Sequence, residues 1–179
     1  MAASSVFCDQ DVPDFVIKDC GVENAGIIAV GLVDPSENPS KANLESKAYW
    51  TGRIAASPQN FFLIQPTRGE YPGGVPTEEE GFGTEVSRVT GADHSVTFEF
   101  EGLLNNHDFV EAVNRKSWKM VYFTNAGYFY YEAIPATLYI TIDNKRSIKT
   151  AAFWKGVSKW ADYSNPIIGT TPSALLDAN

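Results

Sequence analysis

The side chains best suited to acid–base or metal chemistry are two histidines, His94 and His107, each beside an aspartate in the sequence. Histidine can act as a general base or a metal ligand near neutral pH. Adjacent positions do not by themselves make an acid–base pair. His94 falls at a predicted turn and His107 in the first turn of a predicted helix, so we expect structural or solvent-facing roles for both.

Two carboxylates on one predicted strand are the next candidates. Glu99 and Glu101 are two residues apart and would share a strand face, roughly 6–7 Å from each other. A glycosidase pair has comparable spacing, although its members usually come from different strands. A solvated strand face is the expected outcome, and a repeated ring of acidic side chains lining a channel is the alternative.

Sequence motifs for catalysis are absent. The chain has no P-loop, no glycine-rich dinucleotide motif, no nucleophile elbow, no zinc-protease helix and no calcium loop. Two cysteines, Cys8 and Cys20, fall far short of the four closely spaced ligands of a structural zinc site. We expect them to be plain thiols, with a disulfide as the alternative. The sequence therefore predicts a protein that is not an enzyme and that uses no metal or cofactor.

The bulk composition limits the kinds of partner. The 179 residues suit one domain, and the formal charge of −8 repels nucleic-acid phosphates at long range. This argues against sequence-specific DNA binding, although an acidic wall would suit a passage through which DNA slides. No apolar run reaches the roughly 18 residues of a membrane helix, and no signal peptide is visible at the start. We expect a protein used inside a cell or carried in a particle assembled there.

Hydrophobic periodicity predicts a single, mainly β domain. We expect an N-terminal arm over residues 1–25, a core over 26–160 and a C-terminal arm over 161–179. A hairpin is predicted over 82–102 with its turn at 91–93, because Val96, Phe98 and Phe100 alternate with polar residues. The other expected elements are strands at 26–33, 60–65, 118–124, 128–134, 136–142 and within 147–160, a short helix within 41–56, a helix at about 106–116 and a long exposed loop at 67–81.

This order favours an antiparallel β-sandwich or open barrel with one flanking α-helix and extended terminal arms. The chain has more aromatic residues than we expect the core alone to hold. Rings that face out of a strand meander indicate subunit contact, since aromatics are enriched at interfaces. Stacking of sugars or single-stranded bases is a further option, but base stacking needs basic flanks, which are sparse here. The candidate subunit contacts are Trp118, Tyr128, Tyr130, Trp154 and Trp160.

The stretch from Gly81 to about Pro166 resembles the tail-tube and ring proteins of tailed bacteriophages. The resemblance lies in a hairpin led by Gly81-Phe-Gly83, a helix start at Leu103–Asn106, a strand at Trp118–Thr124 and a meander closing at Trp160. The opening around Cys20–Ile28 is similar to virion proteins of phages of Bacteroidetes, the crAss-like group in particular.

The resemblance implies a structural protein that forms a homo-oligomeric ring of a phage tail or neck around the DNA channel. It implies an acidic lumen, which Glu99 and Glu101 would line, and no catalytic residues. The implied partners are further copies of the chain, neighbouring tail or neck proteins, and DNA as non-specific passing cargo, within a virion assembled in the host cytoplasm. A β-sandwich module that binds carbohydrate or protein is the alternative. A hydrolase would require Glu99, Asp108 or a histidine to converge in one pocket.

Overall fold

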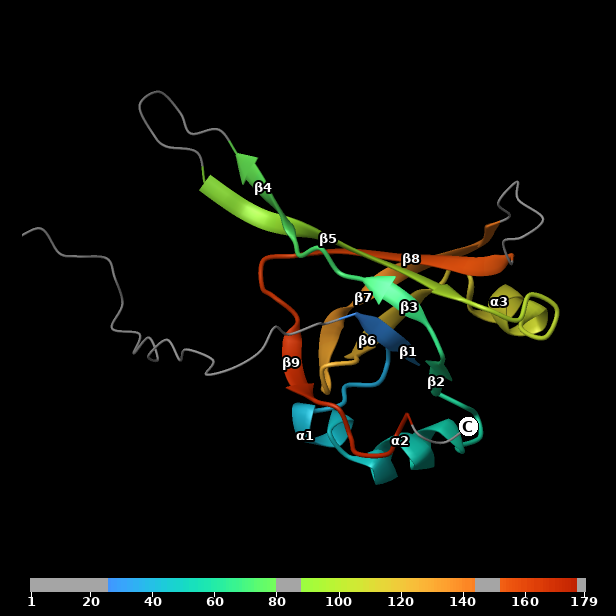
Figure 1. The fold of residues 1–179 in the computed structure, drawn as a ribbon. Coiled ribbons are helices and arrows are strands. Elements are labelled where there is room, and N and C mark those ends of the chain that lie inside the picture. The colour runs from blue at the N-terminus through green and yellow to red at the C-terminus, as the bar shows by residue number, and fades with distance from the viewer. Residues whose placement is uncertain (1–25, 80–87, 144–151, 177–179) are drawn as a thin grey trace, which may run out of the picture.

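The computed structural model describes residues 26–79, 88–143 and 152–176. Its centre is a barrel of antiparallel strands (Figure 1). The strands pair in the order β1, β3, β5, β8, β7, β6, and β6 pairs with β1 again, so the sheet closes on itself. These six strands are β1 (Ile27–Val33), β3 (Arg68–Glu70), β5 (Arg88–Phe100), β6 (Ser117–Thr124), β7 (Tyr128–Asp143) and β8 (Phe153–Asp162).

Three further strands extend the barrel. β2 (Phe61–Ile64) pairs with the second half of β1, β4 (Val75–Glu79) pairs with the start of β5, and β9 (Ile167–Thr170) pairs with the start of β7. The helices are α1 (Lys41–Leu44), α2 (Lys47–Ile54) and α3 (His107–Val113). The predicted mainly β, antiparallel fold with few helices is confirmed.

The barrel interior is built from alternate residues of its strands. On β5 the side chains of His94, Val96, Phe98 and Phe100 are buried, and the residues between them are partly exposed. On β8 the inward positions include Gly156, which carries no side chain. The ring of Phe98 occupies that space, and a Cβ on Gly156 would collide with it. Small and large inward residues therefore interlock across the β5–β8 pair.

One outer side of the barrel is sealed by the chain's own helices and C-terminal residues. We call this side the covered wall. Its core is the indole of Trp50, which packs edge-on against Phe61 and Phe123 with ring centroids 5.3 Å away in both cases. This wall is covered from outside and the core fills the barrel inside. β1 is therefore apolar on both faces, and so is β6 apart from the buried Lys119. The covered wall comprises Ala29, Val33, Phe61, Val121, Phe123, Phe129 and Tyr131, beneath Leu44, Trp50 and Leu175.

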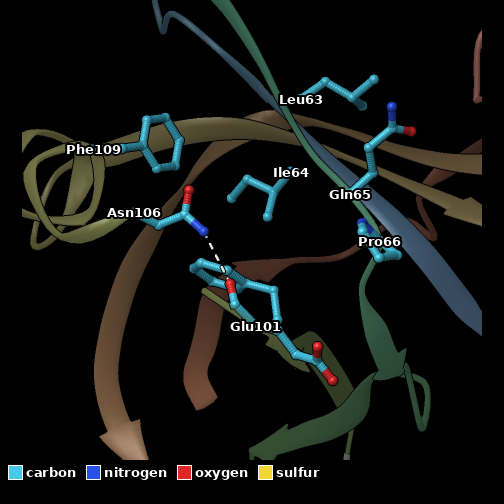
Figure 2. A pocket seen from close by; sticks show the side chains of 8 residues that line it. Leu63, Ile64, Gln65, Pro66, Glu101, Asn106 and Phe109 are labelled. Carbon is cyan, nitrogen blue, oxygen red and sulfur yellow. Dashed lines mark hydrogen bonds between the residues drawn. The ribbon is translucent and has the colours of Figure 1, made fainter. Parts of the chain in front are cut away.

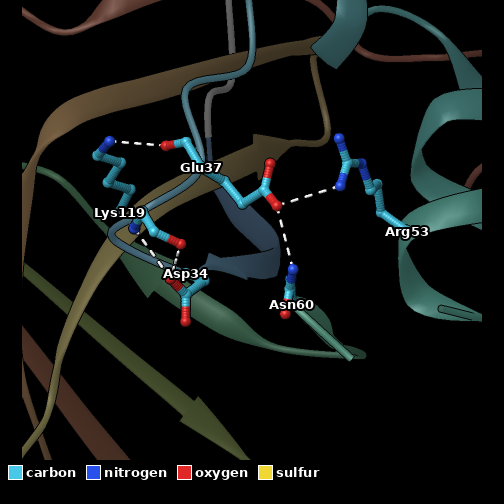
Figure 3. Close-up of polar contacts among 6 residues, drawn as sticks. Asp34, Glu37, Arg53, Asn60 and Lys119 are labelled. Carbon is cyan, nitrogen blue, oxygen red and sulfur yellow. Dashed lines mark hydrogen bonds and ion pairs between the residues drawn. The ribbon is translucent and has the colours of Figure 1, made fainter. Parts of the chain in front are cut away.

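Hydrogen bonds and an ion pair hold the loop between β1 and α1 beside this wall (Figure 3). The ammonium of Lys119, which is 5% exposed, donates to the Glu37 carbonyl oxygen at 2.7 Å and to Asn38 Oδ1 at 2.6 Å. The Glu37 carboxylate accepts from Arg53 at 3.1 Å and from Asn60 at 3.0 Å. The loop thus supplies the oxygen partners that a buried cation requires.

Helix α3 closes one end of the barrel. Val110 and Val113 join the interior core, and the Trp118 indole donates to the Val113 carbonyl oxygen at 3.0 Å. The Asn114 side chain, which follows the helix, exchanges two hydrogen bonds with the backbone of Ile140 on β7. The predicted helix at 106–116 is confirmed, with shorter bounds.

Several predicted boundaries are wrong because strand pairing overrides local composition. Residues 67–81 do not form one long loop, since β3 and β4 lie within them. Residues 91–93 are not a turn, since Asp93 pairs with Val75 of β4 on one edge and with Ala161 of β8 on the other. At Pro135 the sequence allowed either the end of a strand or a bulge, and the structure has the bulge, inside the continuous strand β7.

The predicted C-terminal arm is likewise part of the folded body as far as residue 176. β9 adds to the edge of β7, and Leu175 is buried in the covered wall. The N-terminal arm at 1–25, with Cys8 and Cys20, lies outside the described residues, as do residues 82–87 of the predicted hairpin and the start of the predicted strand within 147–160. None of the helices in the described segments is long and apolar enough to cross a membrane.

Candidate functional site

The most exposed regular structure is a hairpin that leaves the barrel (Figure 1). It consists of β4 and the start of β5, paired from Val75↔Asp93 to Glu79↔Arg88. Every residue of β4 is exposed, including Val75 at 68%. On β5, Val89, which pairs with Glu78, is 48% exposed. β8 pairs with β5 only from Ala92 onward, so residues 88–91 have β4 as their only strand partner among the described residues. We call β4 with residues 88–93 the projecting hairpin.

The base of the projecting hairpin is anchored in the barrel by stacked rings. His94 faces Trp160 across the β5–β8 pair, with centroids 5.0 Å apart and planes 5° from parallel. The hydroxyl of Tyr71, just after β3, lies 2.6 Å from His94 Nδ1. Gly74 lies against the same imidazole so closely that a Cβ there would collide with it. The two chain segments that lead into the hairpin are therefore held by one histidine ring.

A buried carboxylate lies near this anchor, where β7 changes partner. β7 pairs with β9 over residues 128–131 and with β8 over 137–143. Glu132, between these two segments, is 3% exposed, and its Oε1 accepts from the Ile134 amide at 2.9 Å. Oε2 has no hydrogen-bond partner among the described residues, and neither have Trp160 Nε1 and His94 Nε2.

Burial raises the pKa of Glu132 above its usual range. The Ile134 hydrogen bond, the nearby His94 and the indole N–H of Trp160 favour the ionised form, while Asp162 disfavours it. The Trp160 indole lies near the Glu132 carboxyl, yet neither its nitrogen nor Oε2 completes a hydrogen bond with the described residues. A buried carboxyl with one unpaired oxygen is a local instability.

The outer sides of β5, β8 and the second half of β7 form a second surface that no described helix covers. We call it the open wall. Its outward residues alternate with the buried interior ones and stay at least partly exposed. They are Ser95, Thr97 and Glu99 on β5, Lys155, Val157 and Lys159 on β8, and Thr137, Tyr139 and Thr141 on β7.

The open wall mixes cations with exposed rings and apolar side chains. Tyr139 is 48% exposed, and the Arg115 guanidinium carbon lies 6.0 Å from the centre of its ring. Val157 on β8, which pairs with Tyr139, is the apolar residue beside this ring and is partly exposed. Together with Lys155 and Lys159, Arg115 gives this wall three cations on a chain whose net charge is −8.

The two predicted channel acids do not share a face. Glu99 pairs in register with Arg68 on one side and Lys155 on the other, so its charge is flanked by cations. β5 ends at Phe100, and Glu101 lies beyond it. Glu101 lines a separate hollow of about 350 Å³ beside α3, with Asn106, Phe109 and the end of β2 (Figure 2). The expected pair on one strand face is wrong because the strand ends between its members.

The predicted tryptophan contacts are also wrong. Trp118, Trp154 and Trp160 are 5–8% exposed and belong to the barrel's own core. Alternation places Trp154 and Trp160 on the inward side of β8, where they fill space that the small inward residues leave. Tyr128 and Tyr130 are partly exposed and contact each other edge to face at 5.5 Å.

The residues considered for hydrolysis are dispersed. His94 lies inside the barrel, while His107 and Asp108 are exposed on α3 with 3.3 Å between Nδ1 and Oδ1. Glu99 lies on the open wall. In the described segments no three His, Cys, Asp or Glu side chains are grouped to hold a metal ion. The sequence analysis predicted the hairpin at the wrong residues and did not predict the cations of the open wall.

Comparisons with known proteins return no relative. No protein-family model matches the chain, no curated protein matches it, and no solved structure matches it.

Proposed function

We propose that this chain is a structural subunit that works by self-assembly, as a homo-oligomeric ring of a phage tail or neck around the DNA channel. The observation that carries this proposal is the projecting hairpin, an ordered element whose β4 strand is exposed along its whole length. Hairpins of two strands are marginally stable in water unless another surface packs on them. A neighbouring subunit would supply that surface.

The open wall supports the same proposal. It is the one long side of the barrel on which the described helices and C-terminal residues do not pack. The exposed Tyr139 beside Arg115 is typical of the composition of subunit contacts, where tyrosine and arginine are enriched. Self-assembly gives both the hairpin and this wall a role.

The acidic charge supports a channel wall past which DNA moves without adhering, because a negative field repels phosphates. The partners in this proposal are further copies, neighbouring tail or neck proteins and DNA as passing cargo, and the location is the virion. That Glu99 and Glu101 line the channel stays a prediction from the sequence. The proposal needs no catalytic group and no cofactor.

Sedimentation velocity of the purified full chain, from about 1 to 100 µM, tests this proposal. We expect a species of uniform size at a fixed multiple of the monomer mass of 19.6 kDa, with ring-shaped particles under the electron microscope. Closed symmetric assembly predicts one dominant size. A monomer over the whole concentration range would contradict the proposal.

A module that binds carbohydrate is the second candidate, favoured by one aromatic cluster. Tyr71, Tyr128 and Tyr130 are partly exposed, and the Tyr130 ring lies 5.6 Å from Tyr71 and 5.5 Å from Tyr128. Sugars stack on rings of this kind. Titration of soluble oligosaccharides against the chain and a Tyr128→Ala variant would detect such binding, and loss of binding in the variant would favour this candidate.

A further inference from the structure

The projecting hairpin and the open wall carry opposite charges. The hairpin contributes the carboxylates of Glu78, Glu79 and Asp93 against one arginine, Arg88. The open wall contributes Lys155, Lys159 and Arg115, with Glu99 between Arg68 and Lys155. Opposite charges on two surfaces favour their association and fix its orientation.

Within one molecule only the base of the hairpin adjoins the open wall, where Val75 and Asp93 lie beside Ser95 and Lys159. The end of the hairpin, with Glu78 and Glu79, lies beyond the strands of that wall. Residues 88–91 continue β5 beyond the first residue that β8 pairs with, which at about 3.3 Å per residue carries the hairpin roughly 13 Å past the barrel. Lys155 pairs with Glu99 near the opposite end of β5. Because the hairpin extends β5 away from the barrel, its acidic end and the open wall's far end point in opposite directions (Figure 1).

The two surfaces also match in their apolar content. Val75 and Val89 are exposed on the hairpin, while Tyr139 is exposed on the open wall and Val157 opposite it is partly exposed. Each set is too small to be a stable interface without flanking polar contacts. Joined, they give an apolar centre with charged surroundings, which is how subunit contacts are commonly built.

We propose that the projecting hairpin of one copy docks on the open wall of a second copy of this chain, with Glu78 and Glu79 facing Lys155, Lys159 and Arg115. This inference rests on the proposed self-assembly and names its contact. Because different surfaces of the two copies meet, the contact is head-to-tail. Repeating such a contact closes a ring when the rotation from one copy to the next is a whole fraction of 360°. The open wall, Glu99 included, then lies between subunits, so this contact is an alternative to the sequence prediction that Glu99 lines the channel.

Charge reversal on each side tests the contact. One variant carries Glu78→Lys and Glu79→Lys, a second carries Lys155→Glu and Lys159→Glu, and a third carries all four changes. The matched control carries Glu101→Lys and Glu111→Lys, two exposed carboxylates near α3. It changes the net charge by the same amount as the reversal at Glu78 and Glu79. Sedimentation velocity gives the dissociation constant of each, and circular dichroism confirms that each variant is folded.

Each two-site reversal should raise the dissociation constant about tenfold or more, because like charges then face each other across the contact. The four-site variant should recover most of this loss, and so should an equimolar mixture of the two reversals, since a head-to-tail contact pairs each altered surface with its complement. The control should assemble like the unaltered chain. Added salt should weaken assembly of the unaltered chain.

Assembly of the unaltered chain that neither reversal weakens would overturn this contact and leave self-assembly standing. Loss of assembly in both reversals without recovery in the four-site variant or in the mixture would also overturn it, because the two surfaces would then not face each other. An unaltered chain that stays monomeric would overturn the contact together with the proposed function.

Discussion

The covered wall and the open wall are two outer sides of the same barrel, finished in different ways. On the covered wall the outward residues of β1 and β6 are apolar apart from the buried Lys119, and the apolar ones lie beneath Trp50 and Leu175. On the open wall the outward residues of β5, β8 and β7 alternate between small polar, cationic and aromatic types and remain partly exposed. A barrel needs apolar residues on both strand faces only where its own chain covers the outside. The open wall is the side that a second copy covers in the assembly we propose.

The largest expected difference in stability comes from removing one aromatic ring from each wall. Trp50→Ala should lower the free energy of unfolding by about 3–5 kcal/mol, because it empties a fully buried site between Phe61 and Phe123. Tyr139→Ala, on the open wall, should cost less than about 1 kcal/mol in the monomer. Urea unfolding at low protein concentration measures both. Equal losses would contradict the distinction between the walls.

The next largest effect concerns the fit beneath Trp50. A Cβ on Gly31 would lie 2.7 Å from the Trp50 ring, so Gly31→Ala should lower the free energy of unfolding by about 1–3 kcal/mol. Gly52→Ala is the matched control, because it adds the same atom on helix α2 where nothing lies within 4 Å. Alanine favours a helix over glycine, so the control should leave stability unchanged or raise it by up to about 1 kcal/mol. Thermal and urea unfolding of both variants would show whether the contact with Trp50 is as tight as this.

Glu132 lies where the covered and open walls meet on β7, and it should make stability depend on pH. Burial raises the pKa of its carboxyl above the ordinary value of 4.5, so the folded chain holds the proton more tightly than the unfolded chain. Proton binding at Glu132 therefore stabilises the folded chain. This stabilisation is fully present below the ordinary pKa and is lost as the pH rises through the raised pKa. Glu132→Gln lacks this loss.

The Gln variant should therefore be more stable than the parent at neutral pH, with the difference shrinking toward acidic pH. Urea unfolding of both chains between pH 4 and pH 8 measures this difference, and His94 is present in both. A parent chain that gains stability over the Gln variant as the pH rises would show that the carboxylate has a partner in the folded protein.

The smallest effect on monomer stability is expected from the cations of the open wall. Lys155→Ala and Lys159→Ala should each change the free energy of unfolding by no more than about 0.5 kcal/mol, since both side chains are at least partly exposed. The same substitutions should weaken self-assembly. A stability loss comparable to that of Gly31→Ala would mean that these lysines hold their own barrel together.

The sequence predicted well where one residue pattern determines the outcome. The run from residue 26 to 33 predicted a strand buried on both faces, and β1 is apolar toward both the interior and the covered wall. The alternation of Val96, Phe98 and Phe100 predicted which side of β5 is buried. Asn106 and the apolar stripe after it predicted α3.

Predictions from the sequence were wrong where pairing with residues distant in the chain determines the local structure. Gly91–Asp93 has the composition of a turn, but β4 and β8 on its two edges keep it extended. Trp154 and Trp160 were predicted as subunit contacts because aromatic rings are enriched at interfaces. Only the fold shows that Phe98 fills the gap over Gly156 and that Tyr122 bonds Ser158. The cations of the open wall come from separate chain segments, so no local pattern announces them.

The most direct test of the central claim is whether the open wall becomes covered when the chain assembles. Acylation rates of individual lysines, read by mass spectrometry at about 1 µM and 100 µM, would report this for the full chain. We predict that Lys155 and Lys159 become protected at the higher concentration, while Lys41 and Lys47 on α1 and α2 keep their rates. Equal reactivity of Lys155 and Lys159 at both concentrations, in a sample that has assembled, would contradict the claim that another copy covers this wall.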